Sequence, residues 1–159
     1  MADLRGNVSP RRRLAYSLAG LAAGNVALLI YLSISAARAR SALLAQHLGQ
    51  PARQFPLALE MFAVYCVFSL VGWALVGAPV AAFVPSRTVA RLPWPAVVLL
   101  GGALGPLALF LMFLLLSRGA VLGAPGAFRD LGALWLFAAI VSAVAFVVYA
   151  ALLRRYAQQ

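Results

Sequence analysis

The sequence predicts an all-α membrane protein, a four-helix transmembrane bundle with short loops, and two observations lead to this prediction. Of the 159 residues, 65% are hydrophobic and only 10% are charged, with a mean hydropathy of +0.97. Soluble domains average about 45–50% apolar and about 25% charged residues. The second observation is four apolar stretches, each long enough for the roughly 20 helical residues that cross a bilayer core. These stretches cover residues 14–36, 57–84, 94–116 and 131–152, and we expect one transmembrane domain over residues 1–159.

The first stretch follows directly after a basic segment that ends in Arg11-Arg12-Arg13. A basic segment before an apolar run is also typical of a cleaved signal peptide, and small residues near Ala37 and Ala39 offer a cleavage site. The run is longer than a usual signal core and contains Gly20 and Gly24, which are typical of helix packing. We therefore favour a retained first helix, which N-terminal sequencing of the mature protein would check.

The connections differ in length and composition. Residues 40–49 predict either a short interfacial helix in the head-group layer or an extension of the first helix out of the membrane. The second stretch is the longest, so it must tilt, bend or enter the interface, and Pro79 favours a bend in its last turns. Trp94 and Pro95 open the third stretch in a manner typical of a helix start at the membrane boundary.

Small residues recur inside three of the stretches at spacings that let helices approach closely. We predict helix packing at Gly20, Gly24, Gly72, Gly77, Gly101 and Gly105, in a tight bundle or an oligomer. Pro106 leaves the carbonyl group of Gly102 without its helical donor, so it is a candidate hinge in the third stretch. The fourth stretch has no such break and is expected either to pack in the bundle or to face lipid.

Two polar residues inside the stretches are candidate functional residues. Glu60 is an acid within a predicted span, where a charge is costly and is often functional. It lies close to the start of its span, so we favour an interaction with head groups or with Arg53 over a functional role. Asn25 lies in mid-span, where a buried amide needs a hydrogen-bond partner on another helix. The aromatic residues Tyr31, Tyr65, Trp73 and Tyr149 could pack in the bundle or line a cavity.

The net charge of +10 comes from thirteen arginines, which flank the apolar stretches. With four spans, eight arginines share a side with both termini and five lie on the other side, so the positive-inside rule predicts cytoplasmic termini. We expect the arginines to contact anionic lipid head groups rather than nucleic acid, which needs a basic face on a polar domain. The composition favours a multi-pass protein of the bacterial inner membrane.

The residues that usually carry chemistry are scarce. The single cysteine, Cys66, excludes an internal disulfide and the thiol oxidoreductases that need cysteine pairs. His47 and Asp130 are far from Glu60 in sequence and match no metal-ligand spacing. We therefore predict no catalytic residue, no metal and no cofactor, although this leaves open whether the protein is an enzyme.

Three functions fit these observations. The favoured one is a non-enzymatic accessory or assembly subunit that acts through helix–helix packing. The second is a small homo-oligomeric transporter or channel with Glu60 as its proton or cation site. The third is a lipid-modifying enzyme that uses interfacial arginines with Glu60 or His47. We expect a homo-oligomer or a larger membrane complex, but the sequence names no substrate, partner or reaction.

Overall fold

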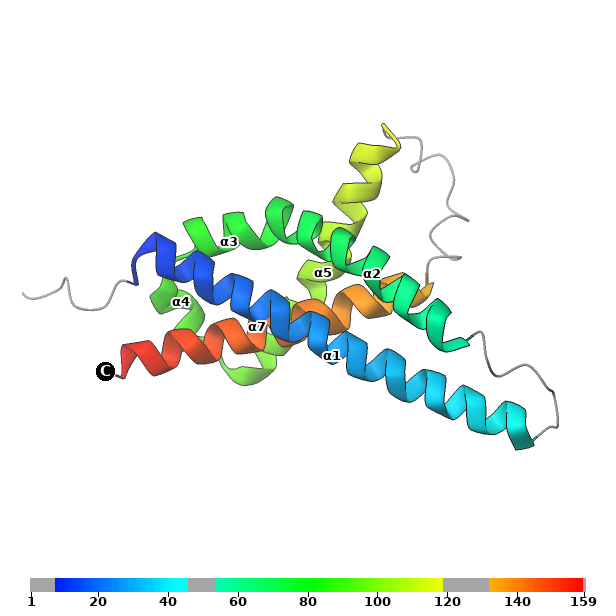
Figure 1. The fold of residues 1–159 in the computed structure, drawn as a ribbon. Helices are drawn as coiled ribbons and strands as arrows, with labels where there is room; N and C mark the ends of the chain where they lie inside the picture. The colour runs from blue at the N-terminus through cyan, green and yellow to red at the C-terminus, as the bar shows by residue number, and fades with distance from the viewer. Residues whose placement is uncertain (1–7, 46–53, 119–131, 159) are drawn as a thin grey trace, which may run out of the picture.

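The computed structural model describes residues 8–45, 54–118 and 132–158, and this part of the chain contains helices and no strands (Figure 1). In chain order the elements are α1 (Pro10–Ala45), α2 (Gln54–Gly72), the π-helix η1 (Trp73–Gly77), α3 (Ala78–Phe83), α4 (Ser86–Arg91), α5 (Trp94–Leu116) and α7 (Gly132–Ala157).

Four helical segments are long and apolar enough to cross a membrane, which confirms the predicted fold class. They are Pro10–Arg38, Phe62–Phe83, Trp94–Leu116 and Gly132–Ala157. The chain therefore has the character of a multi-pass α-helical membrane protein. The helix of the first span continues to Ala45, so residues 40–45 extend α1, while residues 46–49 lie outside the described part of the chain.

One of the four spans contains a π-helical turn. In η1 the backbone N–H of Ala78 donates to the carbonyl oxygen of Trp73, five residues earlier, so α2, η1 and α3 follow one another without a loop. Pro79 comes next, and its ring would clash with the carbonyl group of Leu75, four residues earlier, in a regular helix. Leu75 lies inside η1, so the irregularity of this span directly precedes the proline for which the sequence predicts a bend.

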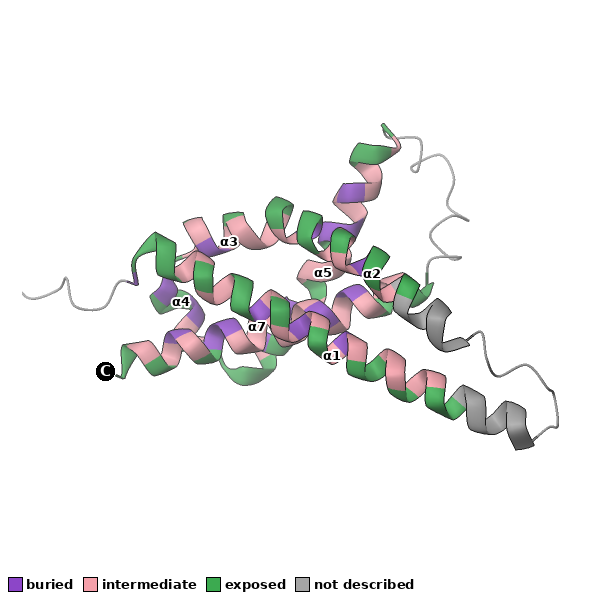
Figure 2. Cartoon of the chain, in the orientation of Figure 1, coloured by how far each residue is buried: buried purple, intermediate pink, exposed green. Residues whose placement is uncertain are grey.

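Helix α7 is the centre of the bundle. Helices α1 and α5 both pack along it and make the most extensive contacts in the described structure. Figure 2 shows buried residues where these helices run side by side, with exposed residues on the outward faces. The arrangement resolves the two alternatives for the fourth stretch, because α7 packs on both neighbours through small residues such as Ala138, Ser142 and Ala145.

The core consists of two clusters of buried side chains. One joins α1, α2, α5 and α7 through Leu28, Tyr65, Leu109 and Val141. The other lies where the start of α1, the short helices α3 and α4 and the end of α7 meet, and its buried residues are Val8, Ala81, Val89, Val97, Tyr149, Ala150 and Leu153. Helix α4 fills the predicted connection over residues 85–93 and buries Ser86 and Val89.

Candidate functional site: a cavity beside the central helix

Helices α1 and α7 approach each other closely at two glycines. A Cβ atom added to Gly20 would overlap the carbonyl oxygen of Ala145, and one added to Gly24 would overlap that of Val141. Both glycines are buried. Only a residue without a side chain allows the backbones to come this near, so the two predicted packing glycines lie at the contact between α1 and α7.

Helix α5 approaches α7 in the same way from another side. A Cβ atom on Gly101 would lie 2.8 Å from Cβ of Phe146, and one on Gly105 would overlap the carbonyl oxygen of Ala138 and the hydroxyl oxygen of Ser142. Gly102, between them, has open space within 4 Å. The helix continues through Pro106 up to Leu116, and the role of Pro106 as a hinge stays a prediction.

The two remaining glycines with a predicted packing role have different surroundings. Gly72 is buried against α5, where an added Cβ atom would lie 3.3 Å from Cβ of Ala108. Gly77 faces its own helix, since an added Cβ atom would lie 2.6 Å from Cδ1 of Trp73. Gly77 thus makes room for the indole ring inside the π-helical turn.

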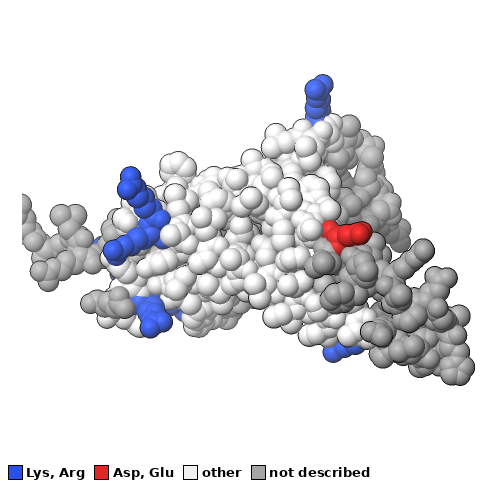
Figure 3. Space-filling view, in the orientation of Figure 1, with Lys and Arg blue, Asp and Glu red and all other residues white. Residues whose placement is uncertain are grey.

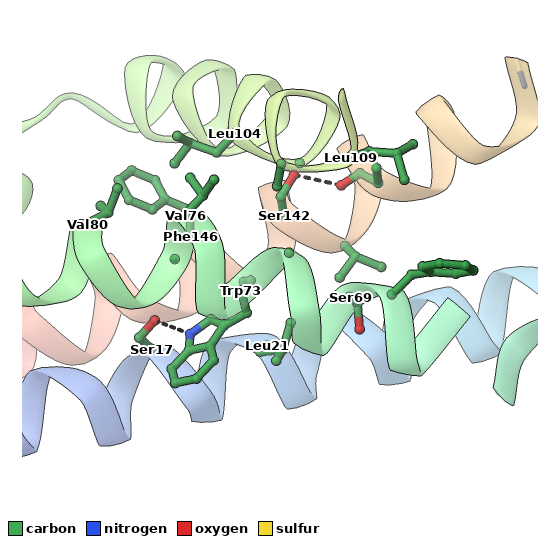
Figure 4. A pocket seen from close by; sticks show the side chains of 18 of the residues that line it. Ser17, Leu21, Ser69, Trp73, Val76, Val80, Leu104, Leu109, Ser142 and Phe146 are labelled. Carbon is green, nitrogen blue, oxygen red and sulfur yellow. Dashed lines mark hydrogen bonds between the residues drawn. The ribbon is translucent and has the colours of Figure 1, made fainter. Parts of the chain in front are cut away.

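Between these contacts lies a cavity of about 110 Å³ that is partly open at the surface of the bundle. It is bounded by α2, η1, α5 and α7, with α1 contributing Ser17 and Leu21 (Figure 4). Its wall is largely apolar and includes Phe68, Val76 and Leu104. Of the four aromatic residues that the sequence offers for a cavity, three line this one, namely Tyr65, Trp73 and Tyr149, whereas Tyr31 packs edge-on against Phe137.

The serine hydroxyl groups on the cavity wall take part in hydrogen bonds between and within helices. Trp73 Nε1–H donates to Ser17 Oγ at 2.8 Å, which joins η1 to α1 (Figure 4). Ser142 Oγ donates to the carbonyl oxygen of Ala138 at 2.7 Å, and this hydroxyl group is the one that Gly105 faces. These bonds give the polar atoms hydrogen-bond partners, which the hydrocarbon of the bilayer cannot provide.

Asn25 makes the kind of contact that is expected of a buried amide. Its Oδ1 atom accepts from Ser69 Oγ at 3.1 Å and lies 3.6 Å from Cys66 Sγ, both on α2. Its Nδ2 atom donates to the carbonyl oxygen of Leu21 at 3.0 Å. Asn25 and Ser69 therefore form a polar link between α1 and α2, and Ser69 also lines the cavity.

Tyr149 differs from the other polar residues of the cavity. Its side chain is only 3% exposed, and its hydroxyl group has no hydrogen-bond partner within the described structure. Arg13 lies at the same core cluster, since its neighbour Leu14 packs against the buried residues that include Tyr149. Arg13 donates from Nη1 to Val84 O and from Nη2 to Ala82 O, both at 2.8 Å, while its Nε atom is buried without a partner in the same part of the chain.

A second arginine binds backbone carbonyl groups at the same end of the molecule. Arg154 donates from Nε to Ala90 O at 3.1 Å and from Nη2 to Leu92 O. Its Cζ atom lies 3.9 Å from the centroid of the Trp94 ring. Arg13 and Arg154 thus donate to carbonyl groups at the ends of α3 and α4, which lack a donor within their own helix. The sequence predicts only topology control and lipid contact for these arginines, because it does not reveal the helix breaks that they bind.

Glu60 lies away from the cavity. It is exposed, near the start of α2, and it is the red residue in Figure 3, toward the end of the molecule opposite most of the visible arginines. Its candidate partners from the sequence, Arg53, His47 and Asp130, lie outside the described part of the chain. The described residues contain no group of three or more potential metal ligands.

Comparison of the chain with protein-family models, with curated proteins and with solved structures found no significant match. Any functional proposal for this protein therefore rests on the geometry of the bundle and its cavity.

Proposed function

We propose that the protein is a non-enzymatic accessory or assembly subunit of the bacterial inner membrane that acts by helix–helix packing. The observation that carries this proposal is that polar side chains inside the bundle make hydrogen bonds between its helical elements. The Trp73–Ser17 and Ser69–Asn25 hydrogen bonds join helices, and Arg13 and Arg154 bind carbonyl groups at helix ends. Each of these groups holds one element against another.

The outer half of α5 is the surface that we propose a partner helix covers. In Figure 1 this end of α5 diverges from α2 and α7. Its outward side chains include Leu115 and Leu116, which are 63% and 69% exposed. The glycine faces of α1 and α5 already pack against α7. A partner helix would therefore contact bulky leucines here rather than glycines.

We also propose that both termini face the cytoplasm. The arginines at the start of α1, in α4 and at the end of α7 share one end of the bundle, because these elements meet in one core cluster. Arg11, Arg91 and Arg155 are exposed there and are available to anionic head groups.

Native mass spectrometry of the protein purified in mild detergent tests the accessory role. We expect a stable complex with a different membrane protein, and a photo-crosslinking residue at Leu115 should capture that protein. Ile30 on α1 is 55% exposed and serves as the lipid-facing control position. A protein that is monomeric in native membranes and gives no protein crosslink from Leu115 would contradict the proposal.

The alternative is a small homo-oligomeric transporter or channel. The observation in its favour is the cavity at mid-span, since transporters bind their substrates near the middle of the bilayer. A closed homo-oligomer in the same mass spectra would support it. Glu60 does not line the cavity, so a proton or cation role for Glu60 would require a separate path. Glu60→Gln should then abolish ion-coupled uptake into vesicles while leaving the oligomer intact.

A further inference from the structure

The cavity lies at the depth of the bilayer core. Its lining on α5 runs from Leu104 to Leu109, in the middle of the Trp94–Leu116 span. Neighbouring side chains that face outward, such as Val71 and Leu107, are apolar and exposed. Because the cavity is partly open at this level, the molecules that can reach it from the side are those dissolved in bilayer hydrocarbon.

The wall of the cavity suits an apolar chain. The hydroxyl groups of Ser69 and Ser142 already donate to protein acceptors, and Ser17 Oγ already accepts from Trp73. An apolar protein cavity of about 150 Å³ is known to take a benzene molecule. A cavity of about 110 Å³ therefore accommodates several methylene groups, which is a segment of a chain rather than a whole lipid.

Tyr149 lies at one end of the cavity, close to the membrane interface. Tyr149 lines the cavity and carries the buried hydroxyl group that lacks a partner among the described residues. It lies one helical turn and a half before Arg154, about 7.5 Å along the axis. Arg154 stacks on Trp94, an arrangement typical of the membrane interface. On α7 the lining continues from Tyr149 back to Ala138, about 16 Å toward the opposite side of the membrane.

From the cavity and the Tyr149 hydroxyl group we infer that this site binds one acyl chain of a bilayer phospholipid. The methylene groups of this chain fill the cavity, and its ester carbonyl oxygen is the acceptor for the Tyr149 hydroxyl group. This site is independent of the partner surface on α5, so the two proposals can fail separately.

Quenching of Trp73 fluorescence by lipids with brominated acyl chains tests the inference, because bromine quenches only at short range. The chain has three tryptophans, and a Trp94→Phe, Trp135→Phe background leaves Trp73 on the cavity wall. In vesicles of brominated phosphatidylglycerol we expect Val76→Phe, which fills the cavity, to lose most of the quenching. Val71→Phe is the matched control, since Val71 lies on the same continuous helix and is 42% exposed. It should keep the quenching.

A second pair of variants covers the case in which Val76→Phe does not fold. Leu104 lines the cavity, whereas Leu107 on the same helix is 49% exposed. Leu104→Phe should lose the quenching and Leu107→Phe should keep it. Equal quenching within a folded pair would overturn the inference. So would the single-tryptophan protein if its Trp73 is not quenched and it retains no phospholipid in native mass spectra.

Tyr149→Phe separates a lipid contact from a merely structural role. In lipid-free detergent the variant should be as stable as the parent or more so, because it removes a buried hydroxyl group without a partner in the described structure. In native mass spectra it should retain less phospholipid than the parent. Retention of free fatty acid instead of phospholipid, or unchanged retention by Tyr149→Phe, would contradict the assigned carbonyl contact.

Discussion

At the scale of single residues, the contacts of α7 depend on the absence of a side chain at particular glycines. Gly101 and Gly105 lie on the same face of α5, and Gly102 lies on another face with open space around it. The backbone of α7 occupies the volume that a side chain at Gly105 would need. The spacing of the glycines predicts that they lie at helix–helix contacts. It does not predict which helix packs against each glycine, because that depends on the tertiary arrangement.

We predict that Gly105→Ala weakens the bundle, whereas Gly102→Ala does not. An added methyl group at Gly105 forces α5 away from Ala138 and Ser142, and such overpacking costs about 1–3 kcal/mol. At Gly102 the same change meets no neighbour and gains about 1 kcal/mol of helix propensity at most. Unfolding of both variants in mixed detergent micelles, followed by circular dichroism, measures the difference. Equal stability of the two variants would count against the close contact at Gly105.

Arg154 is a second residue whose role depends on shape rather than charge alone. Its guanidinium group donates to two carbonyl groups of the chain and stacks on an indole ring. A lysine keeps the charge but offers neither the planar stack nor the paired donors.

Arg154→Lys should therefore destabilise the protein by about 1–2 kcal/mol, the size of a lost hydrogen bond together with a lost cation–π contact. Arg155→Lys is the matched control, because Arg155 is the neighbouring residue and is exposed. Thermal unfolding in detergent, monitored through near-ultraviolet circular dichroism, reports both changes. If Arg155→Lys lowers stability as much as Arg154→Lys, then the loss does not come from the carbonyl and indole contacts of Arg154.

At the scale of elements, the π-helical turn explains why the second span could be predicted only in part. Its length and the proline at position 79 are sufficient to expect a bend. The actual irregularity covers Trp73–Gly77, where Gly77 accommodates the Trp73 ring and Ala78 donates to the fifth residue back. A π turn depends on such a combination of ring, glycine and proline, which no periodicity in the sequence indicates.

We predict that Gly77→Ala displaces the Trp73 ring. The added methyl group would lie 2.6 Å from Cδ1 of the indole, so the ring must move and its 2.8 Å hydrogen bond to Ser17 is lost. In the background with Trp73 as the single tryptophan, its fluorescence emission should shift because the indole N–H loses its partner. Ser17→Ala removes the same hydrogen bond without moving the ring, and Gly102→Ala should leave the spectrum unchanged. An unshifted Gly77→Ala spectrum would show that the turn tolerates a side chain.

At the scale of the whole molecule, the distribution of arginines makes a prediction about orientation. The ends of α1 and α7 that carry Arg11–Arg13 and Arg154–Arg155 lie together, along with α4 (Figures 1 and 3). We expect this end to stay on the cytoplasmic side, because arginine-rich segments are retained there.

Fusions at the C-terminus measure this orientation. A green fluorescent protein placed after residue 159 should be fluorescent, and alkaline phosphatase at the same place should be inactive. Phosphatase fused within residues 119–131, between the third and fourth spans, is the matched control and should be active. An active phosphatase at the C-terminus would reverse the assigned topology.

The number of membrane-spanning helices could be read from the sequence because each span consists of a long apolar run whose composition alone determines its environment. Only part of the candidate site could be predicted from the sequence. The sequence leaves packing or a cavity open for Tyr65, Trp73 and Tyr149, and it gives no indication of Ser142 or of the carbonyl contacts of Arg13. Their roles arise from helices that are distant in sequence and adjacent in space, and composition carries no signal for such pairs.

The central position of α7 has a consequence for biogenesis. Chains are synthesised and inserted from the N-terminus, so α1 and α5 enter the membrane before residues 132–157 have left the ribosome. During that interval the faces of Gly20, Gly24, Gly101 and Gly105 lack the helix that they accommodate. We therefore expect these glycine faces of α1 and α5 to reach their final packing only when α7 inserts between its two neighbours.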